Sequence, residues 1–329
     1  MKPSKPTINE VARKAGVSLA TVSRFLANPF SVKEKNRKKI DEAVKELNYK
    51  PSLFARKLAG GRAGIYGLII PGYEGVFHSY YALEIIRGIG FVLEELNIDL
   101  YLHIWWQKDN FNTSLVDGVI FADIVGNEEQ LERIKKEGLP FVVLNKKMGD
   151  DISYVTIDNF FGGYRATEFL IKHGHRYIAH IAGDLRVEAA LERLNGYKEA
   201  LRKYGLEAKD EYIKVVNFSP LEAKKATEEL LELETPPTAI FAASDEMAIE
   251  ILFLLQRKGV NVPCDISLIG FDDNPVCNYS SVPLTTIRQP LDKMASLGVR
   301  FLKERIEKKK RNKAILSPEL VIRESVNFK

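Results

Sequence analysis

The sequence predicts a small helical unit at the N-terminus, followed by an α/β body of two lobes that are each built on a parallel sheet. A chain of 329 residues is longer than one ordinary domain, so at least two compact units are expected. Charge also divides the chain, because residues 1–62 carry 15 Lys and Arg against 5 Asp and Glu, whereas the remainder carries 33 against 39. Beyond residue 62, short apolar runs alternate with amphipathic stretches, which is typical of strands and helices in α/β lobes.

Composition restricts the class of protein. With 45% hydrophobic and 28% charged residues, the chain resembles globular proteins with ample core. No stretch approaches the roughly 18 consecutive apolar residues of a membrane helix. Residues 1–7 lack the apolar run of a signal peptide, so we expect a cytoplasmic protein without a membrane partner. Cys264 and Cys277 are interpreted as ordinary thiols, because their spacing fits neither a metal knuckle nor a disulfide framework.

The N-terminal segment has the charge of a DNA-binding unit. Its net charge of +10 would attract phosphates, while the rest of the chain, with a net charge of −6, would be repelled by them. Charge alone leaves a second interpretation open, in which the lysines form an ordinary solvated surface.

Two capped helices are predicted within this segment. Thr7 and Glu10 have the spacing of a capping box, so a helix should begin directly after Thr7. Gly16 permits a tight turn, and Ser18 is placed to cap a second helix over about 19–26. In such a helix-turn-helix motif, the N-terminal residues of the second helix reach base edges in the major groove.

The second helix offers few side chains for reading bases. Leu19 and Ala20 should meet the base edges first, and Arg24 shares their face one turn later. Because its fork matches both acceptors of a guanine edge, we expect Arg24 to read a guanine, with a phosphate clamp as the alternative. Thr21 and Ser23 are candidates for phosphate contacts.

Two long stretches carry a resemblance to a known family. They read TINEVARKAGVSLATVSRFLANP and VKEKNRKKIDEAVKELNYKPSLFARKLAGG, and they resemble the headpiece and hinge of the lac repressor and purine repressor (LacI/GalR) family. Further blocks follow in the family's order: DGVIF, VTIDNFFGGYRATEFLIKHGHRYIAHIAG, ALERLNGYKEAL, PTAIFAASDEMAIEIL, VPCDISLIGFDD and PLTTIRQPL. The resemblance therefore covers nearly the whole chain.

The resemblance implies a DNA-binding transcription regulator, by default a repressor, with a periplasmic-binding-protein-like body that holds a small-molecule effector between its lobes. It also implies a homodimer on a pseudo-palindromic operator and, by family frequency, a sugar as the effector; no cofactor and no metal are expected. The implied boundaries are a headpiece at 1–50, a hinge at 51–62 and an effector-binding and dimerisation body at 63–329, with an N-lobe of about 63–157 and 288–317 and a C-lobe of about 158–287 and 318–329.

The family's pattern also assigns roles in the hinge. It places Leu58 where one leucine from each subunit pries apart a central base step in the minor groove, at a cost on the order of a few kcal/mol. Arg56 and Lys57 would hold the adjacent backbone, and Tyr49 would contact a phosphate. The glycines at 60–61 leave a flexible linker as the alternative. The full set of expected DNA contacts is Thr7, Ser18, Leu19, Ala20, Thr21, Ser23, Arg24, Tyr49, Arg56, Lys57 and Leu58.

The chain departs from the family's pattern at two headpiece positions. Ala27 replaces an Asn that many members have after the recognition helix. Lys33 stands where a Ser or Thr usually caps the third helix, which we expect over about 33–47. Ser31 with Glu34 offers a displaced capping box instead.

In the body, the apolar runs predict strands and the amphipathic stretches predict helices. Strands are expected at 65–71, 98–104, 116–122, 140–145, 177–183, 212–216, 238–243, 266–271 and 319–326, and helices at about 79–96, 128–137, 188–204, 221–233, 245–258 and 291–310. Ligands of open α/β sheets bind beyond the carboxyl ends of the strands, so we expect a site between the two lobes.

Polar and aromatic residues near those strand ends are the candidates for effector binding. Asp272 directly follows the strand at 266–271, and its carboxylate can accept hydrogen bonds from hydroxyl or amine groups. By the resemblance, Tyr81, Lys146, Arg193 and Phe218 join Asp272 in the pocket. The alternative for each is a structural role, as a helix cap, a solvated charge or a core aromatic.

One segment of the body is shorter than in most family members. Only about a dozen residues lie between the strands at 98–104 and 116–122, so we expect a loop with at most one turn of helix where others have a full helix. Trp105 and Trp106 lie there and are expected to cover the sheet face left bare. Stacking of one of them on a sugar is the alternative.

An enzyme and a solute-binding protein are the rival classes. The sequence has no G-x-x-x-x-G-K-[ST] motif, the glycines at 88–90 lie inside an apolar helix, and His173 and His175 have no further metal ligands nearby. An enzyme is therefore not expected. The basic headpiece and the missing signal peptide disfavour a solute-binding protein, and no zipper-like heptads follow the helix at 291–310, which favours a dimer over a tetramer.

Overall fold

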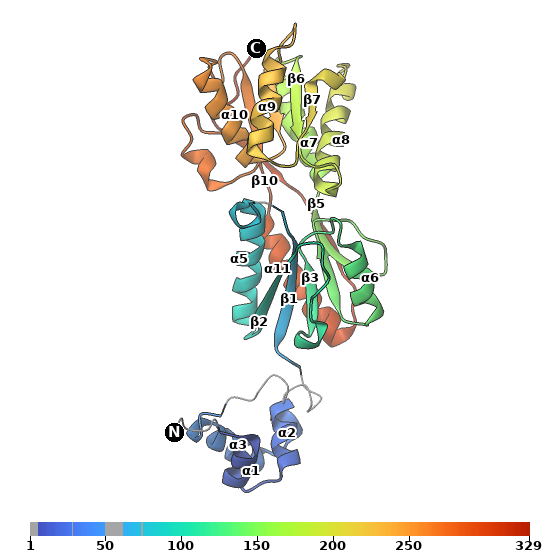
Figure 1. The fold of residues 1–329 in the computed structure, drawn as a ribbon, viewed down its shortest axis with the longest axis vertical. Helices are drawn as coiled ribbons and strands as arrows, with labels where there is room; N and C mark the ends of the chain where they lie inside the picture. Colours follow the sequence, from blue (N-terminus) through green and yellow to red (C-terminus); the bar gives the residue numbers. More distant parts are fainter. Residues whose placement is uncertain (1–5, 28, 50–61, 74) are drawn as a thin grey trace.

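The computed structural model describes residues 6–27, 29–49, 62–73 and 75–329. It contains a three-helix headpiece and two α/β lobes, each with a six-stranded sheet (Figure 1). The predicted fold class is therefore confirmed. Among the described residues, no helix combines the length and the apolar composition needed to cross a bilayer.

The headpiece consists of α1 (Ile8–Ala15), α2 (Leu19–Ala27), the short 3-10 helix η1 (Pro29–Ser31) and α3 (Glu34–Glu46). The capping box is confirmed, since the Glu10 amide donates to the Thr7 hydroxyl while the Thr7 amide donates to the Glu10 carboxylate. Ser18 caps α2 as predicted, accepting a hydrogen bond from the Thr21 amide at 3.3 Å. Apolar side chains from all three helices close a small core.

The displaced capping box is wrong. Helix α3 begins at Glu34 with Lys33 as its N-cap residue, and the Lys33 side chain makes no capping hydrogen bond. Ser31 belongs to η1, where its hydroxyl donates to the Arg24 carbonyl oxygen at 3.2 Å and so ties η1 to α2.

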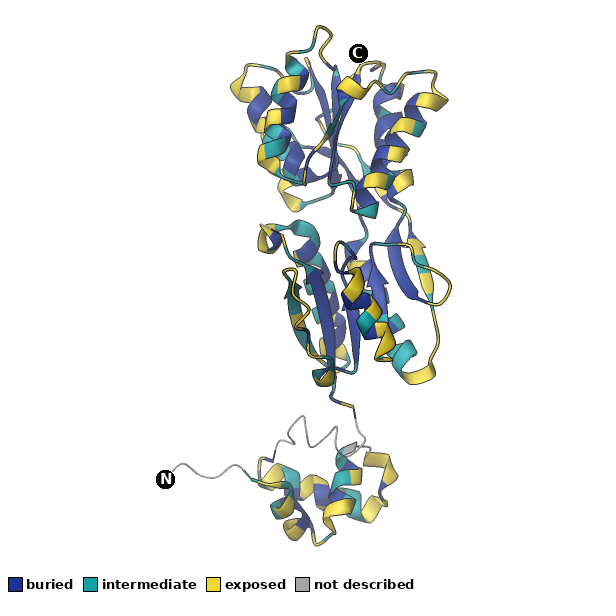
Figure 2. Ribbon diagram, turned by 45° about the vertical axis from the view of Figure 1, so that its right-hand side comes forward, coloured by how far each residue is buried: buried dark blue, intermediate teal, exposed yellow. Residues whose placement is uncertain are grey.

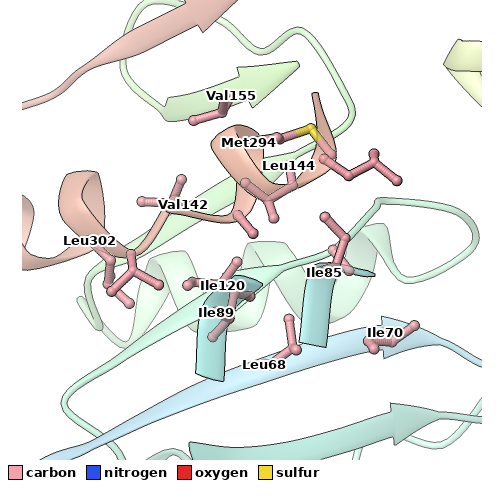
Figure 3. Packing of buried hydrophobic residues seen from close by; sticks show 14 of the residues in the cluster. Leu68, Ile70, Ile85, Ile89, Ile120, Val142, Leu144, Val155, Met294 and Leu302 are labelled. Carbon is pink, nitrogen blue, oxygen red and sulfur yellow. The ribbon is translucent and has the colours of Figure 1, made fainter. Parts of the chain in front are cut away.

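The N-lobe is a fully parallel sheet in the order β11-β5-β4-β3-β1-β2. Its strands are β1 (Ile65–Pro71), β2 (Asp99–Trp105), β3 (Gly118–Phe121), β4 (Phe141–Leu144), β5 (Ser153–Ile157) and β11 (Lys313–Leu316). Helices α5 (Tyr80–Glu95) and α11 (Leu291–Lys308) pack on one face, where Ile85, Ile89 and Met294 meet Leu68 and Ile120 (Figure 3). Helix α6 (Glu128–Lys136) covers part of the opposite face.

The C-lobe sheet has the order β12-β10-β9-β8-β6-β7, in which only β12 runs antiparallel to its neighbour among the described strands. Its strands are β6 (Ile178–Ala182), β7 (Ile213–Val215), β8 (Ala239–Ala242), β9 (Ser267–Asp272), β10 (Thr285–Arg288) and β12 (Glu319–Val321). Its helices are α7 (Asn159–Lys172), α8 (Glu188–Lys203), α9 (Pro220–Leu231) and α10 (Asp245–Arg257), with α7 and α8 on one face and α9 and α10 on the other. Figure 2 shows the central strands of both sheets buried and the outward faces of the helices exposed.

The chain passes between the lobes three times in its described part. The passages lead from β5 to α7, from β10 to α11 and from β11 to β12 (Figure 1). Each lobe is therefore built from separated stretches of sequence, and the carboxyl ends of the parallel strands face the region between the lobes.

The shortened crossover contains a single 3-10 turn, η3 (Thr113–Leu115), as predicted. Phe111, which is 3% exposed, is the main cover of the sheet face: a Cβ on Gly67 would lie 2.7 Å from its ring, and the ring stacks on Tyr101 with centroids 5.3 Å apart. Trp105 packs partly against the same core, whereas Trp106 remains 55% exposed beside Gly72. Sequence reasoning had not singled out Phe111.

His173 and His175 dock the C-terminal segment. His175 is buried, with Nδ1 2.9 Å from the Thr238 hydroxyl and Nε2 3.1 Å from the Asn327 carbonyl oxygen. The His173 ring stacks on Phe328. Among the residues that the structure describes, no group of His, Cys, Asp and Glu side chains is arranged to hold a metal ion.

Candidate functional site

Helix α2 exposes the row predicted to read bases. Leu19 is 46% exposed, and Ala20 and Arg24 are exposed on the same side of the helix. The Arg24 guanidinium touches only its own helix in the described contacts, with Nε 3.4 Å from the Ala20 carbonyl oxygen. Thr21 and Ser23 are half-buried beside this row. One face of α2 therefore combines two apolar side chains with one extended cation.

Tyr49 and Thr7 lie at the two ends of the headpiece. Tyr49 is 7% exposed and packs in the headpiece core, where burial raises the pKa of its hydroxyl. Its ring supports the fold, and a phosphate contact through its hydroxyl stays a prediction. Thr7 is exposed and is occupied by its capping box. Arg56, Lys57 and Leu58 lie outside the described residues.

The N-lobe holds the start of the body firmly. Both oxygens of the Asp117 carboxylate accept backbone hydrogen bonds at 2.7 Å, one from Ala63 and one from Gly64. Arg62 pairs with Glu307 of α11 at 3.2 Å. Residues 62–64, where the chain enters the N-lobe, are thus held by backbone hydrogen bonds and by one ion pair. The sequence analysis did not predict these contacts.

Asp272 ends β9 and is buried at 7% exposure. Its Oδ1 accepts a hydrogen bond from Gln289 Nε2 at 2.5 Å. Burial raises the pKa of this carboxyl, and the nearby Asp245 carboxylate raises it further against the opposing influence of Arg193. The residue adopts φ of 136° and Asp273 adopts 61°, so the turn has two consecutive residues in a backbone region that L-residues rarely occupy.

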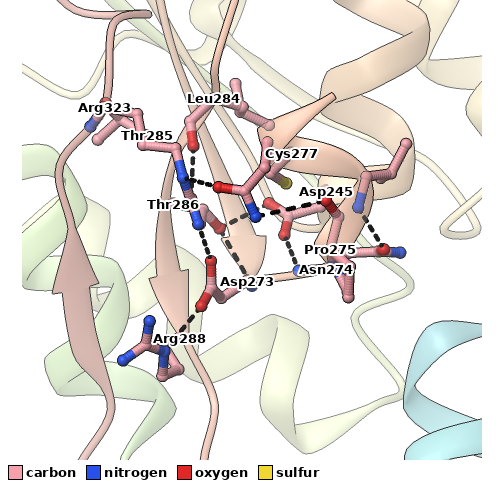
Figure 4. A network of polar contacts seen from close by, with 12 residues as sticks. Asp245, Asp273, Asn274, Pro275, Cys277, Leu284, Thr285, Thr286, Arg288 and Arg323 are labelled. Atoms are coloured by element: carbon pink, nitrogen blue, oxygen red, sulfur yellow. Dashed lines mark hydrogen bonds and ion pairs between the residues drawn. The ribbon is translucent and has the colours of Figure 1, made fainter. Parts of the chain in front are cut away.

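A polar network holds that strained turn (Figure 4). The Asp273 carboxylate pairs with Arg288 at 2.7 Å and with Arg323 at 2.6 Å. Burial alone would raise the pKa of Asp273, but the two arginines hold it below its usual value. Asp245 accepts hydrogen bonds from the Thr286 hydroxyl at 2.6 Å and from the Asn274 amide at 2.8 Å. The network fixes Asp272 from β10, α10 and the C-terminal segment.

Arg193 lies in α8 at 4% exposure with its guanidinium 3.7 Å from the centroid of the Phe271 ring. Its Nε donates to Asn159 Oδ1 at 2.9 Å and its Nη1 to the Ala243 carbonyl oxygen at 2.5 Å. Burial lowers its pKa to about 10. The side chain can lie this deep because Gly163 lets α7 approach α8 closely: a Cβ there would lie 2.2 Å from the Arg193 carbonyl oxygen.

The remaining predicted residues lie at the same edge of the two sheets. Tyr81 donates its hydroxyl to the Ala122 carbonyl oxygen at 2.6 Å, and Lys146 donates to the Ile124 carbonyl oxygen at 3.3 Å. Phe218 has φ of 54°, and its ring lies against Gly183, where a Cβ would be only 2.1 Å away. Burial raises the pKa of Tyr81, and Arg193 of the other lobe is close enough to oppose that shift. Arg193 is thus within electrostatic reach of both Tyr81 and Asp272.

The structure places Asp123 and Asn145 beside these candidate residues. Asn145 Nδ2 donates to Asp123 Oδ2 at 2.7 Å, and the Ile124 amide donates to Oδ1 at 2.7 Å. Burial nevertheless raises the pKa of Asp123 to about 6. The signal for Asp123 was available, because it follows the apolar run of β3 almost as Asp272 follows that of β9. Asn145 carried the same signal, because it directly follows the apolar run of β4.

Each aspartate thus has an amide partner with an unused oxygen. Asn145 and Gln289 give their NH₂ groups to Asp123 and Asp272, so their amide oxygens face away from those carboxylates. Both oxygens are buried and have no hydrogen-bond partner among the described residues. A buried acceptor without a donor costs about 1–3 kcal/mol, which a ligand that donates hydrogen bonds would recover.

Two hydrogen bonds join the lobes directly. Glu246, in the first turn of α10, accepts from the Tyr80 amide at the start of α5 at 2.9 Å. Glu188, at the start of α8, accepts from the Lys147 amide at 2.9 Å. The lobes therefore contact each other at two separate places beside the site.

The comparisons with known proteins agree with this geometry. Residues 7–52 match the family described as "Bacterial regulatory proteins, lacI family", and residues 167–326 match the "Periplasmic binding protein-like domain". Catabolite control protein A of Priestia megaterium is 34% identical, with 92% of this chain and 93% of the relative covered. The transcriptional repressor PurR of Vibrio atlanticus is also 34% identical, covering 97% of this chain and 98% of the relative.

Solved structures show the same similarity. A complex of the transcriptional regulator CelR with cellobiose superimposes with a TM-score of 0.75 at 31% identity, covering 97% of this chain and 99% of that one. A lac repressor dimer bound to operator and the anti-inducer ONPF gives a TM-score of 0.84 at 25% identity, covering 98% and 100%. These relatives regulate transcription and are not enzymes, which confirms that expectation. The chain belongs to the lacI family of bacterial regulatory proteins, as a DNA-binding transcription regulator with an effector-binding body.

Proposed function

We propose that this regulator is a repressor that binds a pseudo-palindromic operator as a homodimer, and that a sugar held between its lobes changes its affinity for the operator. The observation that carries the proposal is the pair of buried amide oxygens, Asn145 Oδ1 and Gln289 Oε1, beside the Asp123 and Asp272 carboxylates. Within the described part of the chain, neither oxygen has a hydrogen-bond donor. Sugar hydroxyls supply donors of this kind, and the relative CelR was solved with cellobiose.

Aromatic side chains support the choice of a sugar. Phe218 lies at the end of the C-lobe sheet and Tyr81 at the start of α5, so a ring is available from each lobe. Apolar faces of sugar rings pack on aromatic rings, while their hydroxyls need the acceptors described above. Lys146 and Arg193 complete the proposed pocket with Asp272.

The homodimer is supported by an exposed apolar strip along one side of the body. Phe77 is 59% exposed and Phe91 of α5 is 67% exposed, while Phe253 of α10 is 55% exposed and Tyr279 is 85% exposed. The hydrogen bond from Tyr80 to Glu246 joins the N-termini of α5 and α10, and both helices lie on the same side in Figure 1. A second copy of the chain would bury this strip by two-fold symmetry, as suits a palindromic site.

On the operator, α2 would lie in the major groove with Leu19, Ala20 and Arg24 against base edges and with Thr21 and Ser23 near phosphates. The proposed hinge contacts, Arg56, Lys57 and the Leu58 wedge, would bend the centre of the operator. Sugar binding would change the angle between the lobes and so alter how the two headpieces are spaced.

The test begins with selection of binding sites from random DNA by the full chain, followed by operator titrations with and without sugars that raise its melting temperature. A two-fold symmetric sequence and a sugar-dependent change in operator affinity are expected. Arg24→Ala should cost about 1–3 kcal/mol of operator binding and relax preference at one base pair per half-site, whereas Lys108→Ala, a charge loss in the body, should change neither.

Asp272→Ala separates the two sites. It should abolish the sugar response and leave operator affinity unchanged. Loss of operator affinity would mean that Asp272 is structural, and a selected sequence without two-fold symmetry would refute the homodimer.

A further inference from the structure

The charges buried around the proposed interlobe site do not balance. Asp123, Asp245 and Asp272 are each at most 8% exposed, and Arg193, at 4%, is the only Lys or Arg buried to this degree among the described residues. Asp123 belongs to the N-lobe and the other two carboxylates to the C-lobe. Because burial weakens solvent screening, a further negative charge placed here would be repelled far more strongly than at the surface.

Arg193 is partly committed to groups of the protein itself. Asp272 and Asp245 both act on its charge, its guanidinium stacks on Phe271, and two of its nitrogens donate to Asn159 and Ala243. Lys146 is half-buried, donates to the Ile124 carbonyl oxygen and lies close enough to act on Asp123. Both cations therefore already offset carboxylates of the protein itself.

The uncommitted polar atoms point to the same kind of ligand. The amide NH₂ groups of Asn145 and Gln289 donate to the aspartates, which leaves two buried amide oxygens that have no donor among the described residues. A phosphate or carboxylate group brings acceptors only and would leave these oxygens without donors. Hydroxyl groups bring donors without adding charge.

We propose that the interlobe site selects its ligand by charge, so that it admits an uncharged, hydroxyl-rich sugar and rejects phosphorylated and acidic sugars. This proposal rests on the proposed function, because it specifies the chemical class of the ligand at that same site. Its physical basis is the excess of buried carboxylates over buried cations together with the surplus of acceptors.

The experiment uses matched sets of ligands and the full chain at neutral pH. Each set contains a neutral sugar, its uronic acid, the uncharged uronamide of the same shape and the sugar phosphate, with dissociation constants measured by calorimetry. The neutral sugar and the uronamide are expected to bind about tenfold or more tightly than the uronate and the phosphate. The uronamide separates charge from size, because it differs from the uronate mainly in charge.

The outcomes separate the two proposals. An anionic member that binds as tightly as its neutral partner overturns selection by charge but leaves the interlobe site standing. If no member of any set binds, the proposed function fails, and this inference fails with it.

A variant tests whether the buried carboxylates cause the preference for uncharged ligands. Asp123→Asn removes one buried charge while keeping the shape of the side chain, so the preference for uronamide over uronate should narrow by about threefold or more. Glu229→Gln, which removes a charge from an exposed pair with Lys214, is the control and should leave the preference unchanged. An unchanged preference in Asp123→Asn overturns the proposal. Asp272→Asn gives the same comparison from the other lobe if Asp123→Asn does not fold.

Discussion

Each lobe contributes one buried aspartate, paired with an amide side chain, to the candidate site, but the two lobes stabilise their aspartates differently. In both, an aspartate at or just beyond the end of a central strand is held by an amide, Asp123 by Asn145 in the N-lobe and Asp272 by Gln289 in the C-lobe. In the C-lobe, Arg193 acts on Asp272 directly, and Arg288 and Arg323 hold the adjoining Asp273. The N-lobe aspartate has no buried cation beside it among the described residues. The C-lobe half is thus held by arginines, whereas the N-lobe half is held by one amide, one backbone hydrogen bond and the charge of the half-buried Lys146.

The largest expected effect comes from removing the C-lobe cation. Arg193→Ala should lower the free energy of unfolding by about 3–5 kcal/mol, because it leaves Asp272 and Asp245 buried without a compensating charge. Urea titration monitored by circular dichroism measures this. Arg186→Ala, which removes an exposed partner of Asp184, should change stability by less than about 1 kcal/mol. A loss of similar size in both variants would contradict the role assigned to Arg193.

The N-lobe should be sensitive to its apolar cover instead. Phe111→Ala should cost about 3 kcal/mol, because the ring fills the space above Gly67 where the crossover has no helix. Trp106→Ala, at an exposed ring in the same segment, should cost less than about 1 kcal/mol. Thermal unfolding of the two variants measures these losses. A larger loss for Trp106→Ala than for Phe111→Ala would show that Trp106, and not Phe111, covers the sheet.

The Asp123 carboxyl should make the N-lobe sensitive to pH. Burial raises its pKa to about 6, so between about pH 4 and pH 6 the folded chain keeps a proton that the unfolded chain has lost. The stability that this carboxyl contributes is therefore present at low pH and is lost as the pH rises through about 6. Relative to the parent chain, Asp123→Asn should gain about 2 kcal/mol between pH 4 and pH 7. Parallel pH profiles for the two proteins would refute the shift.

The smallest expected effect is the difference in stability loss between variants of the two amides, Asn145 and Gln289. Asn145→Ala and Gln289→Ala each remove one hydrogen bond to a buried carboxylate, at a cost of about 1–3 kcal/mol. The loss should be larger for Asn145→Ala by about 1 kcal/mol, because Arg193 still stabilises Asp272 after Gln289 is removed. Equal losses would mean that the two halves are supported alike.

The sequence predicted most of the strands and helices because long apolar runs and capped amphipathic stretches leave little choice. It gave no range for α7, and it missed β5, β10 and β11, which are four or five residues long. Strand β11 directly follows the basic run at the end of α11. Thr7 and Ser18 were identified as caps because capping depends on neighbours within one turn. The predicted cap of α3 was wrong because the Ser31 hydroxyl donates a hydrogen bond to the carbonyl oxygen of Arg24, which lies seven residues away.

Within the site, Asp272 was identifiable because its position follows from one strand. Asp123 carries almost the same signal, but its pairing with Asn145 depends on two strands meeting in the sheet. The hydrogen bond from Tyr80 to Glu246 joins residues 166 positions apart in different lobes. Such contacts depend on how separately folded units dock, and no local pattern encodes them.

The hydrogen bonds of Asp117 to the backbone of residues 63–64 affect how motion of the N-lobe reaches the headpiece. Its two short hydrogen bonds to Ala63 and Gly64, with the Arg62 pair to Glu307, make the exit of the headpiece segment part of the rigid N-lobe. In the proposed dimer, a small rotation of each N-lobe would act through a lever arm and displace the two exits by a larger distance. These contacts would transmit the rotation of the N-lobe to the headpiece. If they were removed, the lobes would still move when the ligand binds, but the headpieces would no longer move with them.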